Sequence, residues 1–212
     1  MKLDTTLRDS LAQDALKCLR NASRDSTALL RGSLAEGSAD RYSDIDIVWE
    51  VPDDLFPACV SRAGEILSQV RPIASIRSDP DFQNSDKRRL LFVRFAGVPL
   101  FWRVDIEVFA KSIHRDPEYD AGNPEARGSD WSLTESALMN AIAAIKAIMR
   151  GNHDEAQQLL IRGHERVGLD VLQDLSPKQR ILYLSRQVAK LDPQAASLAE
   201  QIIELAEQTL AT

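Results

Sequence analysis

Two aspartates separated by one isoleucine, Asp44 and Asp46, constrain the fold of this 212-residue chain more than any other feature. They begin the stretch 44–51, which is predicted to be a strand because it is rich in β-branched and aromatic residues. Side chains alternate in a strand, so both carboxylates point to one face while Ile45 and Ile47 point into the core. Two adjacent carboxylates repel each other unless a cation lies between them, and a hard divalent ion that takes oxygen ligands would relieve this repulsion.

A second acidic pair lies in a predicted hairpin, whose strands 89–96 and 100–109 are joined by Gly97-Val-Pro99. In the second strand, one face is predicted to carry Trp102, Val104, Ile106 and Val108. The other face is predicted to carry Phe101, Arg103, Asp105, Glu107 and Phe109. An acidic pair in a strand otherwise made of β-forming residues leaves one face with uncompensated charge, which is unusual. The run Lys87-Arg88-Arg89 before this hairpin is predicted to be a solvated strand entry.

A short apolar run at 27–31 is predicted to be a buried strand that leads into Gly32-Ser33. Ten residues then separate Ser33 from Asp44. We expect a helical turn after Ser33, closed by Gly37. Backbone N–H groups and the serine hydroxyl in such a turn are suited to a phosphate group.

The remaining patterns predict an α+β chain of two parts. Helices are expected over 5–20 and 55–70 and a strand over 73–76. The Pro-, Gly- and Asn-rich stretch 117–130 marks the boundary, which we place between domains 1–120 and 121–212. After it, helical patterns with caps at Ser132 and Ser176-Pro177 predict an up-down bundle of four helices.

Composition excludes several classes of protein. The formal net charge of −6 argues against a general nucleic-acid binder or polymerase, so no nucleic-acid partner is expected. Cys18 and Cys59 belong to no Cys-x-x-Cys or Cys/His cluster, which favours free thiols in a reducing compartment. The sequence has no apolar leader segment and no run long enough to span a bilayer. We therefore expect a cytoplasmic protein without a membrane partner.

Together, Gly32-Ser33, Asp44-Ile45-Asp46 and Val104-Asp105-Ile106 resemble the motifs of the nucleotidyltransferase superfamily (DNA polymerase β-like). The form Gly-Ser-x-Ala-x-Gly followed by Ser-Asp-Ile-Asp is similar to small bacterial members. These include antibiotic nucleotidyltransferases and the minimal nucleotidyltransferases of toxin–antitoxin pairs. The resemblance covers about residues 28–109. It implies a mixed-sheet nucleotidyltransferase domain with flanking helices, followed by an all-α helical bundle.

The resemblance also implies a catalytic set. Asp44, Asp46 and Asp105 would hold two Mg²⁺ ions, with Asp46 bridging them. Asp105 would either complete the metal site or act as general base, and Glu107 is the alternative base. The residues expected to bind the nucleotide are Gly32, Ser33, Arg41 and Ser43.

One residue departs from the pattern of the family. Many relatives carry Arg where this chain has Glu36, so Arg31, Arg41 or a residue of the helical part would have to contact the phosphates. The expected function is transfer of a nucleoside monophosphate, AMP from ATP, to a hydroxyl of a small molecule such as an aminoglycoside or lincosamide. The alternatives are a toxin–antitoxin type enzyme that AMPylates a protein, and a non-catalytic nucleotide-binding module. Apolar positions on the terminal helices would permit a homodimer.

Overall fold

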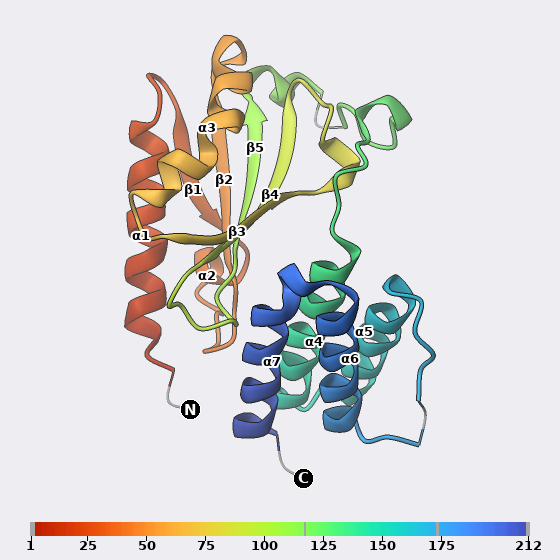
Figure 1. Ribbon diagram of the computed structural model, residues 1–212. Helices are drawn as coiled ribbons and strands as arrows, with labels where there is room; N and C mark the ends of the chain where they lie inside the picture. Colours follow the sequence, from red (N-terminus) through yellow and green to blue (C-terminus); the bar gives the residue numbers. More distant parts are fainter. Residues whose placement is uncertain (1–2, 117, 173, 211–212) are drawn as a thin grey trace. The chain divides into compact units, whose positions relative to one another are not determined.

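The computed structural model of this chain describes residues 3–116, 118–172 and 174–210 and has the α+β class expected from the sequence (Figure 1). The chain divides between Trp131 and Ser132 into two compact units. The first, the sheet unit, contains the β-sheet and three α-helices. The second, the helical unit, contains four α-helices.

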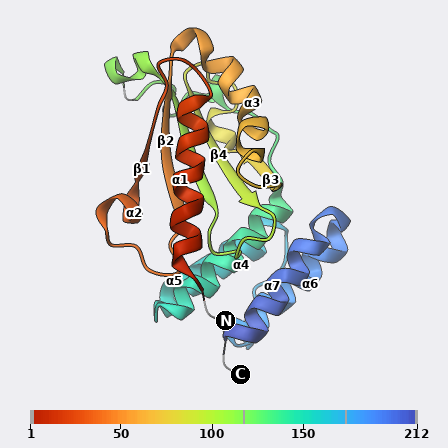
Figure 2. The same ribbon diagram turned by 90° about the vertical axis from the view of Figure 1, so that its left-hand side faces the viewer.

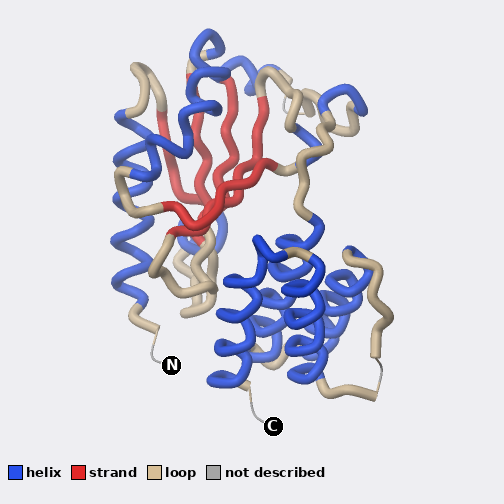
Figure 3. The backbone as a smooth tube through the Cα atoms, in the orientation of Figure 1, coloured by secondary structure: helices blue, strands red, loops and turns tan. Residues whose placement is uncertain are grey.

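The sheet unit is built on one mixed sheet of five strands, drawn in red in Figure 3. The strands follow the order β1-β2-β5-β4-β3 across the sheet. β2 and β5 are parallel, and the other neighbouring pairs are antiparallel. The bounds of the strands are β1 Thr27–Arg31, β2 Ile45–Val51, β3 Ile73–Ser78, β4 Arg88–Phe95 and β5 Val104–Ala110.

One face of this sheet is covered by α1 (Thr5–Asn21) and α3 (Phe56–Ser68), which lie on the same side of the strands, toward the viewer in Figure 2. α1 begins after Asp4, whose carboxylate accepts a hydrogen bond from the backbone N–H of Thr6 (3.1 Å). The apolar stripes of both helices pack on alternate residues of the strands. The fully buried members of this core include Ala15, Leu19, Ile47, Trp49, Val104 and Ile106.

The hairpin of β4 and β5 was predicted correctly, but its second strand begins at Val104 rather than at residue 100. Phe101, predicted on the polar face, is instead fully buried and packs edge-on against Tyr42 (ring centroids 5.1 Å apart). Trp102 is also buried, and its indole N–H donates to the carbonyl of Arg41 (2.9 Å). Both aromatic residues therefore form a buried loop between the strands.

The segment before Trp131 is tied to the sheet unit. The side-chain carbonyl of Gln83 accepts a hydrogen bond from the backbone N–H of Asp130 (3.1 Å). The Asn84 amide donates to the carbonyl of Arg127 (2.6 Å). These contacts place the division of the chain after Trp131, whereas composition alone suggested residue 120.

The helical unit begins at Ser132, whose hydroxyl accepts from the N–H of Glu135 (3.0 Å). Ser176 and Gln179 form the capping box that starts α6. α4 packs on α5, α6 packs on α7, and α4 also contacts α6 and α7. The four helices are α4 Leu133–Met149, α5 His153–Arg166, α6 Pro177–Leu191 and α7 Ala196–Thr209.

Short 3-10 helices connect several of these elements. They are η1 Asp53–Leu55, η2 Pro80–Phe82, η3 Lys111–Arg115, η4 Pro124–Ala126 and η5 Pro193–Ala195. Among the described residues, every helix is too short or too polar to cross a membrane.

Candidate functional site

The face of the sheet opposite α1 and α3 carries a row of charged side chains. Asp46 of β2 and Asp105 of β5 are direct register partners in the parallel pair, so their carboxylates emerge next to each other. Asp44 immediately precedes β2, and like the other two it is partly buried. The structure thus brings together Asp46 and Asp105, which lie about sixty residues apart in the sequence. Asp44 lies just before the strand that carries Asp46.

The charges in this row act strongly on Asp46. Its pKa is raised above the usual value, first by burial and then by the negative charges of Asp105 and Asp44. The positive charges of Arg31 and Arg103 oppose this rise but do not cancel it. Asp46 therefore sits in a field in which additional positive charge would be stabilising.

Arg103 forms a bidentate ion pair with Asp105. Its Nε donates to Oδ1 and its Nη2 to Oδ2, each at 2.6 Å. Burial lowers the pKa of Arg103, but the hydrogen bonds and charge of Asp105, together with the charges of Asp44 and Asp46, raise it overall. Arg103 is therefore held as a cation within the carboxylate row.

Glu107, the alternative base, is also paired with arginine. One carboxylate oxygen pairs with Arg31 of β1 and the other accepts from Arg88 of β4 (3.1 Å). The guanidinium of Arg88 lies over the rings of Phe82 (4.2 Å) and Phe109 (5.4 Å). Glu107 of β5 thus links β5 to the adjacent strand β4 and, across β2, to β1, and its charge is balanced by two arginines.

Gly32 lies directly against Asp46. It begins the short helix α2 (Gly32–Glu36) with φ at +59°, a conformation that favours glycine. A Cβ added to Gly32 would lie 2.8 Å from Oδ2 of Asp46, so only glycine allows the backbone this close. Gly37 ends α2 in the left-handed conformation, as expected from the sequence.

The other residues predicted to bind nucleotide, Ser33, Arg41 and Ser43, are not in direct contact with the carboxylate row as Gly32 is. Ser33 is partly buried and follows Gly32 in α2. The hydroxyl of Ser43 is engaged with Asp40: it donates to Oδ1 and accepts from the backbone N–H, both at 3.0 Å. Arg41 is exposed, and its backbone carbonyl accepts from Trp102. Ser43 therefore shapes the turn before Asp44 through Asp40.

A pocket of about 210 Å³ opens at the carboxylate row. Its lining comprises two of the three predicted catalytic carboxylates, Asp46 and Asp105. The remaining lining residues are Arg31, Ile47, Leu90 and Glu107. Of the arginines considered as substitutes for the position of Glu36, Arg31 lines this pocket, directly across from Asp46 in the register of β1 and β2.

No complete metal-ligand group is formed by the carboxylates as they stand. Over the described ranges of the chain, no three His, Cys, Asp or Glu side chains converge closely enough to hold a metal ion. The ion pair between Arg103 and Asp105 supplies a physical reason, because a guanidinium already occupies both oxygens of the third carboxylate.

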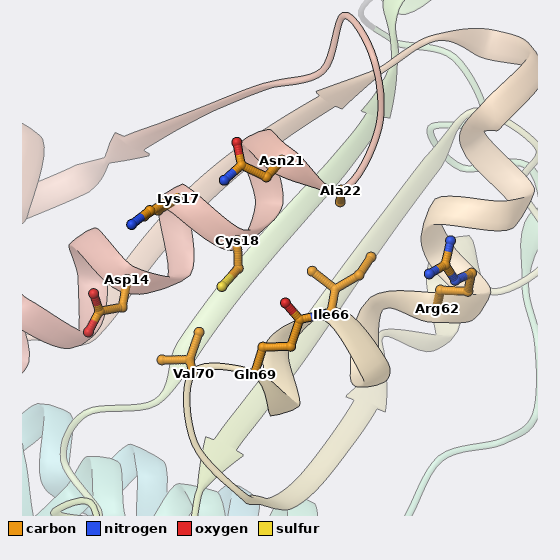
Figure 4. A pocket seen from close by; sticks show the side chains of 9 residues that line it. All are labelled: Asp14, Lys17, Cys18, Asn21, Ala22, Arg62, Ile66, Gln69 and Val70. Carbon is orange, nitrogen blue, oxygen red and sulfur yellow. The ribbon is translucent and has the colours of Figure 1, made fainter.

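A larger pocket, of about 550 Å³, lies on the opposite side of the sheet unit, where α1 and α3 approach each other (Figure 4). Its lining mixes polar side chains with Ile66 and Val70, and Cys18 directs its thiol into it (Figure 4). Lys17 and Arg62 stand at its margins. Both thiols of the chain are free, Cys18 partly buried and Cys59 buried. This pocket shares no residue with the carboxylate row.

Sequence reasoning predicted Arg31 near the site but missed the roles of two other arginines, Arg88 and Arg103. Arg88, predicted in a solvated strand entry, is largely buried between a carboxylate and two rings. Arg103 was assigned to the polar face, but its pairing with Asp105 was not predicted. The available signal was their spacing, because Arg103 precedes Asp105 by two residues, and alternation places such residues on one face.

Neither a protein-family model nor a curated protein matches this sequence. The functional conclusion therefore depends on the motif and on the geometry of the carboxylate row.

Proposed function

We propose that this chain is a Mg²⁺-dependent nucleotidyltransferase and that its sheet unit has the arrangement of that superfamily. It would move a nucleoside monophosphate, AMP from ATP, to a hydroxyl of a small acceptor molecule. The observation that carries the proposal is the direct pairing of Asp46 with Asp105, with the Gly32 turn against the Asp46 carboxylate. A cation site beside a turn suited to phosphates is what a nucleoside triphosphate requires.

The carboxylates fit a divalent cation in charge and chemistry. Asp44 and Asp46 would hold it, since oxygen ligands suit Mg²⁺. The pKa of Asp46 is raised mainly by burial and then by repulsion from the neighbouring carboxylates, and a bound cation would relieve that repulsion. Asp105 would join them once Arg103 leaves one of its oxygens. Bound Mg²⁺ would neutralise charge on the phosphates and on the leaving pyrophosphate.

The protein's own residues would position the reactants. Gly32, Ser33 and Arg31 would orient the triphosphate, since the backbone of Gly32 and the guanidinium of Arg31 both lie beside Asp46. The acceptor oxygen would attack the α-phosphorus in line, and the bond to pyrophosphate would break. In the alternative to its role as a cation ligand, Asp105 would take the acceptor's proton once Arg103 moves off it. Glu107, paired with Arg31 and Arg88, is the weaker candidate for that base.

The acceptor class comes from the resemblance. An aminoglycoside or lincosamide is proposed first because the motif is similar to that of small bacterial members that include antibiotic-modifying enzymes, and because a helical unit follows the sheet unit in the sequence, as in that branch. Protein AMPylation of a toxin–antitoxin type is the alternative acceptor chemistry.

A non-catalytic nucleotide-binding module is the second candidate, and one observation favours it. The guanidinium of Arg103 neutralises Asp105, which would otherwise complete the metal site. A protein that only binds nucleotide has no need of a third cation ligand, so the ion pair between Arg103 and Asp105 would never have to break.

The test is nucleotide transfer by the purified chain. We would incubate it with Mg²⁺, α-³²P-labelled nucleoside triphosphates and a panel of aminoglycosides, lincosamides and proteins. The proposal expects a labelled product that Asp46→Asn abolishes. The matched control is Glu50→Gln, which removes a carboxylate charge from the same face of β2 four residues away and should preserve transfer. Transfer unaffected by Asp46→Asn would contradict the mechanism, and Mg²⁺-dependent binding without any transfer would support the second candidate.

A further inference from the structure

The ion pair between Arg103 and Asp105 is more constrained than an ordinary surface pair. Both carboxylate oxygens are engaged, each at 2.6 Å, in the parallel geometry that a guanidinium fork allows. The two side chains are largely buried, 23% and 17% exposed. Such a pair costs side-chain entropy and desolvation, so its stabilisation of the fold is small.

An aromatic ring supports the guanidinium from the side. Phe92 of β4 is the register partner of Asp105, and the guanidinium carbon of Arg103 lies 4.6 Å from the centre of its ring. The backbone of Arg103 is fixed as well, because its carbonyl accepts from the N–H of Ile45 at 2.9 Å. Arg103 is therefore held in position at the carboxylate row rather than extended into solvent.

A divalent cation and Arg103 compete for the same charge. A cation bound by Asp46 and Asp105 would stand within a few ångströms of the guanidinium, and like charges repel strongly in a partly buried site. Phosphates change this balance, since they add negative charge and accept the same two-pronged hydrogen bonds from arginine that Asp105 accepts now.

We propose that Arg103 is a positioning residue that excludes divalent cations from Asp105 until the phosphates of a nucleotide draw its guanidinium away. The site would then assemble its cation only together with the triphosphate. This inference rests on the proposed function, because it assumes that Asp46 and Asp105 are cation ligands.

The test measures Mn²⁺ binding without nucleotide, by calorimetry and by the electron paramagnetic resonance signal of free Mn²⁺. Arg103→Gln removes the charge and should bind Mn²⁺ about tenfold more tightly than the unaltered chain. Arg88→Gln is the matched control. Arg88 also contacts aromatic rings and pairs with a carboxylate of β5, but that carboxylate is Glu107 and not Asp105. It should change the affinity by less than about twofold.

Combining Arg103→Gln with Asp105→Asn shows whether Arg103 changes the Mn²⁺ affinity through Asp105. In Asp105→Asn the gain from Arg103→Gln should become much smaller, because there is no carboxylate left to release and only the repulsion between Arg103 and a cation at Asp46 is removed. A gain of the same size in Asp105→Asn would overturn the inference, since it would reflect only the net charge of the face. Arg103→Lys keeps the charge but loses the fork, and it should bind Mn²⁺ more tightly than the unaltered chain, which keeps the inference testable if Arg103→Gln does not fold.

The outcomes distinguish a failure of this inference from a failure of the proposed function on which it rests. Equal Mn²⁺ affinity in Arg103→Gln, Arg103→Lys and the unaltered chain, with binding lost in Asp46→Asn, would reject the role of Arg103 and leave the proposed function standing. Absence of Mn²⁺ binding from every folded variant would reject both.

Discussion

The two faces of β5 differ in what holds their side chains in place. On one face, Val104, Ile106 and Val108 are fully buried beneath the helices. On the other, Asp105 and Glu107 are partly buried and held by arginines. Apolar burial stabilises the fold by about 1.5–3 kcal/mol per large side chain, whereas clustered carboxylates weaken it. The covered face therefore supports the fold, and the open face serves another purpose.

The largest effect is expected on the open face, as a loss of activity without a loss of stability. Asp46→Asn should lower nucleotide transfer by about a thousandfold or more, because it removes the carboxylate shared by the cation and the phosphate turn. Steady-state transfer assays would measure this, with thermal unfolding as the check on folding. A loss of activity that accompanies a loss of stability would break the contrast between the faces.

The reverse pattern is expected on the covered face. Ile106→Ala should lower the free energy of unfolding by about 2–5 kcal/mol, because it leaves a cavity in the core where Ile106 is fully buried. Chemical denaturation would measure the loss. The folded fraction should keep the divalent-cation affinity of the unaltered chain, and a change in that affinity would mean that the two faces are not independent.

Gly32 tests the contact between the turn and the carboxylate row. Gly32→Ala should destabilise the chain by about 1–2 kcal/mol through its positive φ and should also displace Asp46. Gly37→Ala is the matched control, because Gly37 has φ at +73° but open space where a Cβ would lie. Nucleotide binding should weaken only in Gly32→Ala. Equal weakening in both variants would assign the effect to backbone strain alone.

The smallest effect concerns the pH dependence of stability. Because the pKa of Asp46 is raised by folding, its protonation stabilises the folded state, and this contribution is lost as pH rises through the raised value. Asp46→Asn should therefore raise the melting temperature at pH 7 by a few degrees. Below the ordinary pKa of about 3.8 the gain should vanish. A melting temperature that falls at pH 7 would mean that Asp46 stabilises the fold.

Local patterns in the sequence were sufficient for most of the fold. The composition of 44–51 predicted β2, which begins one residue later, at Ile45, and the capping residue Ser176 located the start of α6. The start of β5 was predicted too early, because Phe101 and Trp102 have the composition of a strand. Their burial in a loop depends on Tyr42 and on the carbonyl of Arg41, which sequence periodicity does not reveal.

Local patterns in the sequence also predicted part of the site. The motif and alternation gave the carboxylates, and the strand register then made neighbours of Asp46 and Asp105. The arginine partners depend on which strands pair: Arg31 and Arg88 meet Glu107 only because β1 and β4 lie on either side of the β2–β5 pair. Ser43 was expected at the nucleotide, but its hydroxyl is engaged by Asp40 in the preceding turn.

Titration calorimetry with ATP, in the presence and absence of Mg²⁺, is the sharpest test of the claim that the open face binds a nucleotide through a cation. If the open face holds a nucleotide through a cation, the unaltered chain will bind ATP only with Mg²⁺ and Asp46→Asn will bind it weakly or not at all. Binding that needs no divalent ion, or that is indifferent to Asp46, would contradict the claim, as would the absence of binding.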